Sequence, residues 1–308
     1  MRRNVSMTLE SDALTVRTVA RMFREHAKRV YVRTDGTPTR HHANIGLALD
    51  RLEDLHGGMP AGDLDPRALK AVRTSWVTGG LTRNTINKQV RYIRQVWDWA
   101  AEMDLVDEAV AEQLHTVKNL PTGMAPEGKG VRPADLEDVR ATIAELPEPL
   151  ANMVRFLLLP GCRVGEAREA RADEVIYCDD GPFLCPQWHK TARYDKVREI
   201  PLNAPAYALV SSLEDREYLF GVGDGSRPYQ RDSLINAINR VCRRTGITKW
   251  SPGQLRHNAA TGIFRAHGLE ATASVLGHSS TRVTSRYVHA RNNKQAMGAA
   301  GALSQMTA

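Results

Sequence analysis

The chain has 308 residues, of which 42% are hydrophobic and 25% charged, a composition that supports a buried core and favours two domains. The net charge is +7, which weakly indicates a polyanionic partner. No stretch approaches the ~18 apolar residues of a membrane span, and no apolar run follows Met1 as in a secretory signal, so we expect a cytoplasmic protein without a membrane partner.

The cysteines do not indicate a disulfide framework or a metal site. The chain has four cysteines, and none belongs to a Cys-x-x-Cys pair. Cys178, Cys185 and His189 are conceivable zinc ligands, but no fourth ligand is evident and their spacing is wide. We therefore expect neither a metal nor another cofactor.

The first part of the chain is expected to be helical. After a disordered start over 1–11, apolar residues at helical spacing predict a helical domain over 12–117. Its longest helix runs from about 82 to 102, with apolar residues on one face and Lys88, Arg91 and Arg94 on another. A charged helix face of this kind is usually simply solvated.

A Pro- and Gly-rich stretch over 118–130 reads as a linker to a second domain over 131–290, followed by a tail over 291–308. Alternating segments at 174–178, 183–189 and 197–202 predict a small antiparallel sheet. Helices are expected near 133 and over 149–159, 204–213, 230–245, 252–267, 270–276 and 280–290. The predicted fold class is thus mainly α with a small antiparallel β-sheet (α+β).

Positive charge is concentrated at the end of the chain. From Ser233 to Ala308 there are ten Lys and Arg residues and a single acid, Glu270. Within this stretch, Arg240, Arg243 and Arg244 lie off the apolar face of the helix expected over 230–245. A foldable stretch almost without carboxylates indicates a phosphate-facing surface, although a solvated basic tail is the simpler alternative.

Arg163 is the first candidate for chemistry at a phosphate. It follows the helix-ending pair Pro160-Gly161 and precedes Val-Gly-Glu166, which begins the next helix. A guanidinium grips two phosphate oxygens, and Glu166 can hold it in place. Taken alone, Arg163 is more often an ordinary surface arginine at a turn.

Three further candidates follow near helix ends. Arg256 lies in the first turn of a helix that Ser251 caps and Pro252 begins, and His278 follows Gly277, a candidate helix C-cap. Tyr287 comes nine positions after His278 (287 − 278). In isolation, Arg256 is more often solvated, and Tyr287 is more often a core aromatic than a nucleophile, because a free phenol has a pKa near ~10.

Together these residues closely resemble the tyrosine recombinases of the phage integrase family. The matching segments are Gly161-Cys-Arg-Val-Gly-Glu166, Leu255-Arg-His257, Leu276-Gly-His-Ser-Ser280 and Arg286-Tyr287. The resemblance is strong over about 131–290. It implies that the N-terminal helices form a core-binding domain whose Lys88, Arg91 and Arg94 face DNA.

The resemblance also implies the site residues. Tyr287 would be the nucleophile, Arg163 and Arg256 would stabilise charge on the phosphate, and His278 would orient it. The family places a lysine in a turn of its small sheet, which matches Lys190 best, with Lys196 as a second candidate. Its second motif usually reads His-x-x-Arg, but Gly253 stands at the histidine position here. What replaces that histidine is open.

The implied function is site-specific cleavage and rejoining of double-stranded DNA through a 3′-phosphotyrosyl intermediate, for integration, excision or resolution. The implied assembly is a tetramer on two DNA sites, with the tail over 291–308 contacting a neighbouring protomer. Two alternatives remain: a catalytically weakened relative that only binds DNA, and a relaxing enzyme similar to type IB topoisomerases.

Overall fold

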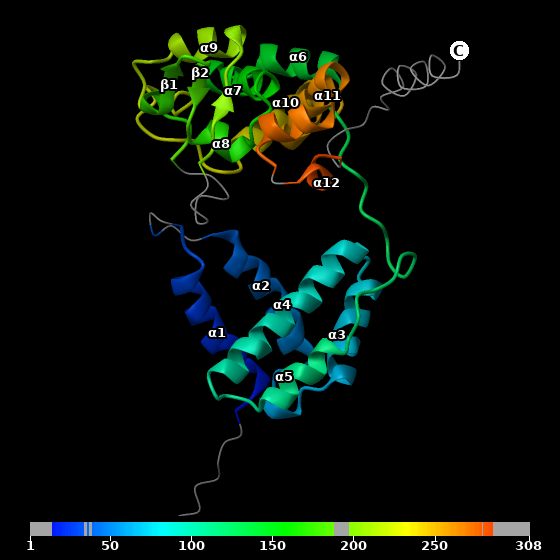
Figure 1. The fold of residues 1–308 in the computed structure, drawn as a ribbon. Helices are drawn as coiled ribbons and strands as arrows, with labels where there is room; N and C mark the ends of the chain where they lie inside the picture. Colours follow the sequence, from blue (N-terminus) through cyan, green and yellow to red (C-terminus); the bar gives the residue numbers. More distant parts are fainter. Residues whose placement is uncertain (1–13, 34–35, 37–38, 188–196, 279, 286–308) are drawn as a thin grey trace, which may run out of the picture. The chain divides into compact units, whose positions relative to one another are not determined.

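The computed structural model describes residues 14–33, 36, 39–187, 197–278 and 280–285. It separates into two compact units, Met1–Lys129 and Gly130–Ala308 (Figure 1). The predicted fold class is confirmed, because the described residues are mainly helical and carry one small antiparallel sheet. None of the helices in the described part has the length and apolar character needed to span a bilayer.

The first unit is a helical bundle built around a central helix. Its helices are α1 (Val16–Val30), α2 (Arg40–His56), α3 (Pro66–Thr78), α4 (Arg83–Glu102) and α5 (Glu108–His115), with a short 3-10 turn at Ala61–Asp63. The α4 helix packs against each of the other four because one of its faces is continuously apolar. At the centre of the core, Trp97 is fully buried and its indole Nε1 donates to Ala61 O at 3.1 Å.

Part of the segment expected as a linker packs onto α4. Leu120 is buried in the core of the first unit, and its backbone N donates to Asn87 Oδ1 at 2.7 Å. Further along, Arg83 N donates to Pro126 O at 2.8 Å, and the Arg83 side chain pairs with Glu127. These contacts attach the segment after α5 to the first unit.

The second unit places a three-stranded sheet on one side and its last helices on the other (Figure 1). Its elements are α6 (Leu136–Glu145), α7 (Glu148–Leu158), α8 (Val164–Arg168), β1 (Val175–Cys178), β2 (Gly181–Leu184), β3 (Ile200–Pro201), α9 (Ala204–Ser211), α10 (Ser233–Thr245), α11 (Pro252–Leu276) and α12 (Thr281–Thr284). The strands pair antiparallel in the order β1-β2-β3. Helix α7 contacts α6, α8, α9 and α11, which makes it the centre of the core.

The second unit differs from expectation at two places, both in the sheet. The second strand ends at Leu184 rather than at 189, since Pro186 has no N–H for a sheet ladder. The third strand is only Ile200–Pro201, so the predicted range of 197–202 was too long. By contrast, the two helices expected over 252–267 and 270–276 are the two parts of α11, which a non-helical Gly268 with φ +83° and ψ −173° separates.

Candidate active site

Arg163 is held by a buried carboxylate at the start of α8. Its backbone N donates to Glu166 Oε2 at 2.7 Å, and its Nη1 donates to Glu166 Oε1 at 2.6 Å. The Glu166 side chain is 1% exposed, whereas that of Arg163 is 27% exposed. The carboxylate therefore fixes one side of the guanidinium, while part of the group faces solvent.

The turn before Arg163 packs against α11. Gly161 has φ +64°, and a Cβ added there would lie 2.8 Å from Ala259 Cβ. Only glycine meets both requirements without strain or displacement. Between Gly161 and Arg163, burial raises the pKa of the Cys162 thiol to about 12, so this cysteine stays protonated at neutral pH.

Arg256 is buried and connects two turns, the one at Gly161 and the one at the end of α11. It is 5% exposed, with Nη1 donating to Gly161 O at 2.8 Å and Nη2 donating to Leu276 O at 2.6 Å. Its Nη2 also lies 3.0 Å from His278 Nε2. These partners are 95, 20 and 22 residues away in sequence, so Arg256 joins distant segments of the chain at one place.

The contacts of His278 define its tautomer. A guanidinium can only donate, so the Nε2 atom facing Arg256 must accept and carries no proton. The proton then lies on Nδ1, which donates to Thr284 Oγ1 at 2.9 Å. Burial, followed by the charges of Arg256, Arg163 and Arg198, lowers the pKa of His278 to about 4. The imidazole is therefore neutral at physiological pH.

Arg198, which sequence reasoning missed, joins this cluster. It is 6% exposed, and its Nε lies 3.7 Å from Glu166 Oε1. Its Nη2 donates to Val275 O at 3.1 Å. One signal was present in the sequence: residues 198 and 200 face the same side of an extended segment, and Ile200 is an apolar residue that the sheet buries. Thr284, the partner of His278, had no comparable signal.

Gly253 lies in the first turn of α11 and is exposed. A Cβ added to it would meet nothing within 4 Å, so the position has room for a larger side chain. His257, four residues later, is instead 7% exposed. Within the described residues, no group of three or more His, Cys, Asp or Glu side chains could hold a metal ion.

The predicted nucleophile Tyr287 and the lysine candidates Lys190 and Lys196 lie outside the described residues. The structure thus brings together Arg163, Glu166, Arg256 and His278. The catalytic roles expected for all of these residues stay predictions.

The basic face of α4 has two different parts. Lys88 and Arg91 are exposed, and the Lys88 ammonium lies 5.5 Å from the centre of the Tyr92 ring. Arg94 is half-buried, and its Nε and Nη2 have no hydrogen-bond partner among the described residues. Burial and then the charge of Arg73 lower the pKa of Arg94, which identifies the two guanidinium groups as neighbours.

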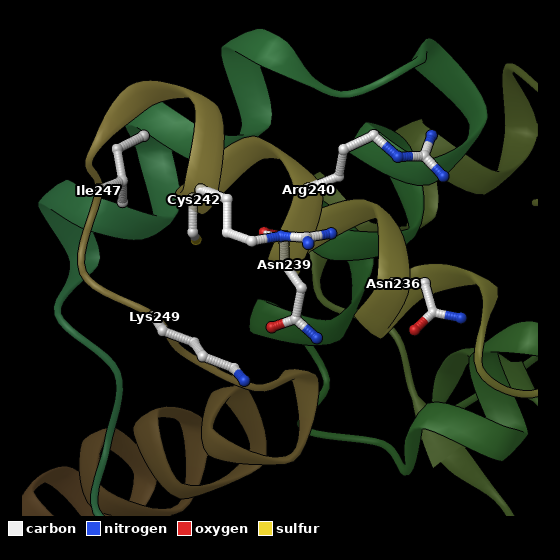
Figure 2. Close-up of a pocket in the computed structure, with 7 residues that line it drawn as sticks. Asn236, Asn239, Arg240, Cys242, Ile247 and Lys249 are labelled. Atoms are coloured by element: carbon white, nitrogen blue, oxygen red, sulfur yellow. Dashed lines mark hydrogen bonds between the residues drawn. The ribbon is translucent and has the colours of Figure 1, made fainter.

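A basic groove of about 550 Å³ runs beside α10, and its lining residues are Asn236, Asn239, Arg240, Cys242, Arg243, Ile247 and Lys249. Figure 2 shows Asn239 of α10 and Lys249 of the following segment facing the same opening, while Arg240 extends away from them. By contrast, Arg244 pairs with Glu145 at 2.7 Å. The basic residues that line the groove are Arg240, Arg243 and Lys249. Of these, Lys249 was not among the residues predicted from the sequence.

Comparison with known proteins agrees with this architecture. The model of the phage integrase family matches residues 131–294. The tyrosine recombinase XerC of Corynebacterium glutamicum is 23% identical over 288 residues, covering 88% of this chain and 87% of that protein. Transposase B from transposon Tn554 of Staphylococcus aureus is 25% identical over 173 residues, covering 50% of this chain but only 26% of the transposase.

The fold also matches a solved structure of a lambda integrase tetramer bound to a Holliday junction. The TM-score is 0.68 at 12% sequence identity, and the match covers 90% of this chain and 78% of that chain. At this identity, the similarity concerns the fold alone.

Proposed function

The chain belongs to the phage integrase family, and we propose on that premise that it is a site-specific tyrosine recombinase acting on double-stranded DNA. The observation that carries the proposal is the cluster of Arg163, Glu166, Arg256 and His278, which the fold assembles from distant segments. Preorganised donors of this kind stabilise charge that develops on phosphate oxygens. A neutral imidazole beside them adds a group that can accept a proton.

In the proposed reaction, the Tyr287 oxygen attacks the scissile phosphorus and the bond from phosphorus to the 5′-oxygen breaks. A 3′-phosphotyrosyl link forms, and Lys190 gives a proton to the leaving 5′-oxygen, which becomes a hydroxyl. The 5′-hydroxyl of another strand then attacks the link, releases the tyrosine and joins new ends. The covalent link retains the phosphodiester bond energy, so the cycle needs no nucleotide cofactor.

The contacts of His278 suggest how the cluster responds to DNA. Arg256 occupies the lone pair of His278 Nε2 in the free protein. A phosphate oxygen that accepts from Arg256 competes for this donor and frees Nε2. The freed nitrogen can then bond to the phosphate or accept the phenol proton, a task for which Gly253 has no side chain. Thr284 keeps the other nitrogen protonated and the ring oriented.

We assign DNA contacts to both units. On the first unit, the exposed Lys88 and Arg91 of α4 can reach phosphates, whereas Arg94 lies on the same helix with its Nε and Nη2 buried. On the second unit, the groove with Arg243 and Lys249 supplies a second basic surface. Phosphate contacts of this kind release counterions and make the affinity depend on salt.

The decisive experiment is covalent trapping on a nicked duplex. Tyr287→Phe should bind DNA with parental affinity and form no covalent adduct, while the control Tyr229→Phe should form adduct at the parental rate. A normal adduct yield from Tyr287→Phe would refute the assignment of the nucleophile. No adduct from the parent on any family-type substrate would favour the alternative of a relative that binds DNA without cutting it.

A second assay separates recombination from relaxation. We propose that four protomers hold two DNA sites, because the similar lambda integrase forms a tetramer on a Holliday junction. The tail over 291–308 would contact the neighbouring protomer, and the recombination reaction would take place in the cytoplasm. A two-site plasmid assay should yield exchanged products and Holliday junctions. Relaxed plasmid without exchange would instead indicate an enzyme like the type IB topoisomerases.

A further inference from the structure

We propose that Arg198 is a positioning residue that holds the turn carrying His278 against the turn carrying Arg163 and Glu166. The proposal rests on the proposed function, because it concerns the same phosphate-binding cluster. Arg198 lies just before β3, in neither of the two turns, and contacts both of them. It therefore acts through other residues and not on the phosphate itself.

The contacts of Arg198 connect two elements that are remote in sequence. Its Nη2 donates to Val275 O, 77 residues later, at 3.1 Å, near the end of α11. Its Nη1 donates to Glu199 O at 3.0 Å, and its Nε faces Glu166 Oε1 at 3.7 Å. A buried guanidinium needs such partners to offset its lost hydration. Arg198 is thus held by two hydrogen bonds and by a longer ion pair with Glu166.

The turn at the end of α11 fits this guanidinium closely. Gly277 has φ +63°, and a Cβ added there would lie 2.6 Å from Arg198 Nη1 and 3.0 Å from Cζ. Two backbone bonds of 2.9 Å close the turn, from Gly277 N to Ser274 O and from His278 N to Ala273 O. The guanidinium thus packs against the residue directly before His278.

Glu166 lies between two guanidinium groups. Arg163 approaches it at 2.6 Å and Arg198 at 3.7 Å, both through Oε1. Moving the turn that carries His278 would therefore also disturb the carboxylate that holds Arg163. Because the planar guanidinium donates in two directions at once, a lysine in its place keeps the charge but not the geometry.

The first test measures positioning without any reaction. Amide hydrogen exchange in the full-length chain should become at least about tenfold faster over 274–278 in Arg198→Met and Arg198→Lys, since each loses bonds worth roughly a factor of ten or more. The matched controls are Arg171→Met and Arg171→Lys, because Arg171 forms exposed ion pairs with Asp173 and Glu217. Exchange at 274–278 equal to that of the parent would overturn the proposal.

The second test measures the reaction in a single turnover. Both Arg198 variants should form adduct about 10²-fold more slowly than the parent, with unchanged duplex affinity. A substrate whose leaving oxygen is replaced by sulfur needs no proton donor, so it should not restore the rate. Restoration would place the defect at the proton donor and overturn the proposal, as would parental activity in Arg198→Lys. The parent's own adduct through Tyr287 tests the proposed function separately.

Discussion

Arg163 and Arg256 should respond differently to removal. Replacing Arg256 with alanine leaves Gly161 O and Leu276 O without the donor that each has in the parent. An unsatisfied buried group costs about 1–3 kcal/mol, so two cost about 2–6 kcal/mol. Removing a buried charge stabilises the fold and so acts in the opposite direction. We therefore expect the free energy of unfolding to fall by about 2–4 kcal/mol, the lower half of this range.

Arg163→Ala is the matched comparison. Its guanidinium is partly exposed and pairs with a single carboxylate, Glu166, so its loss should lower the free energy of unfolding less than the loss of Arg256. Both variants should lose at least ~10² in cleavage rate, because each removes a charge aimed at the phosphate. Only Arg256→Ala should also unfold at a clearly lower temperature.

Calorimetry of the full-length chain provides the assay. A loss of about 2–4 kcal/mol corresponds to a Tm decrease of roughly 4–16 °C for a unit of this size, at ~2–4 °C per kcal/mol. The decrease should affect the transition of the second unit and leave that of the first unit in place. Equal Tm values for Arg163→Ala and Arg256→Ala would refute the view that Arg256 organises the turns as well as binding phosphate.

Three further outcomes are expected. A Cβ at position 253 has open space around it, so Gly253→His should fold. If the site lacks a proton acceptor, this variant should cleave faster than the parent, and its rate should show a new titration near ~6.5, the pKa of free histidine. An unchanged pH profile would mean that position 253 does not face the phosphate. The lowered pKa of His278, about 4, means that the unfolded chain binds more protons between pH 4 and 6.5. Stability should therefore fall as pH drops through this window, and urea titrations of His278→Gln should show a weaker fall. Gly161→Ala forces a Cβ to 2.8 Å from Ala259 Cβ, so circular dichroism melts should show a lower Tm, and a parental Tm would contradict the packing.

The sequence predicted those contacts whose signals are local. Arg163 and Glu166 are three residues apart at a helix start, and their contact follows from helix geometry. Arg256 was identified from its motif, but its burial was not, because both carbonyl partners lie on segments whose placement depends on the tertiary fold. Local patterns carry no information on such long-range contacts.

Surface charges show the same limit. In the sequence, Lys88, Arg91 and Arg94 cannot be distinguished, because all three lie on one basic face of a helix. In the structure, only Arg94 is half-buried, next to Arg73. Arg244 belonged to one predicted DNA-facing set, but its ion pair is with Glu145, 99 residues earlier. Helical periodicity assigns a side chain to a face, whereas the neighbouring elements determine what that face meets.

The sharing of Glu166 by arginines has a consequence for the charge that the site can accept. Among the described residues, the cluster holds the cations Arg163, Arg198 and Arg256 and the anion Glu166, while His278 is neutral, so its formal charge is 3 − 1 = +2. A phosphodiester carries a single negative charge, but the five-coordinate species formed during attack carries two. In the proposed reaction, the charge of the cluster would match the transient species better than the resting DNA, and a difference of this kind in binding is what accelerates a reaction.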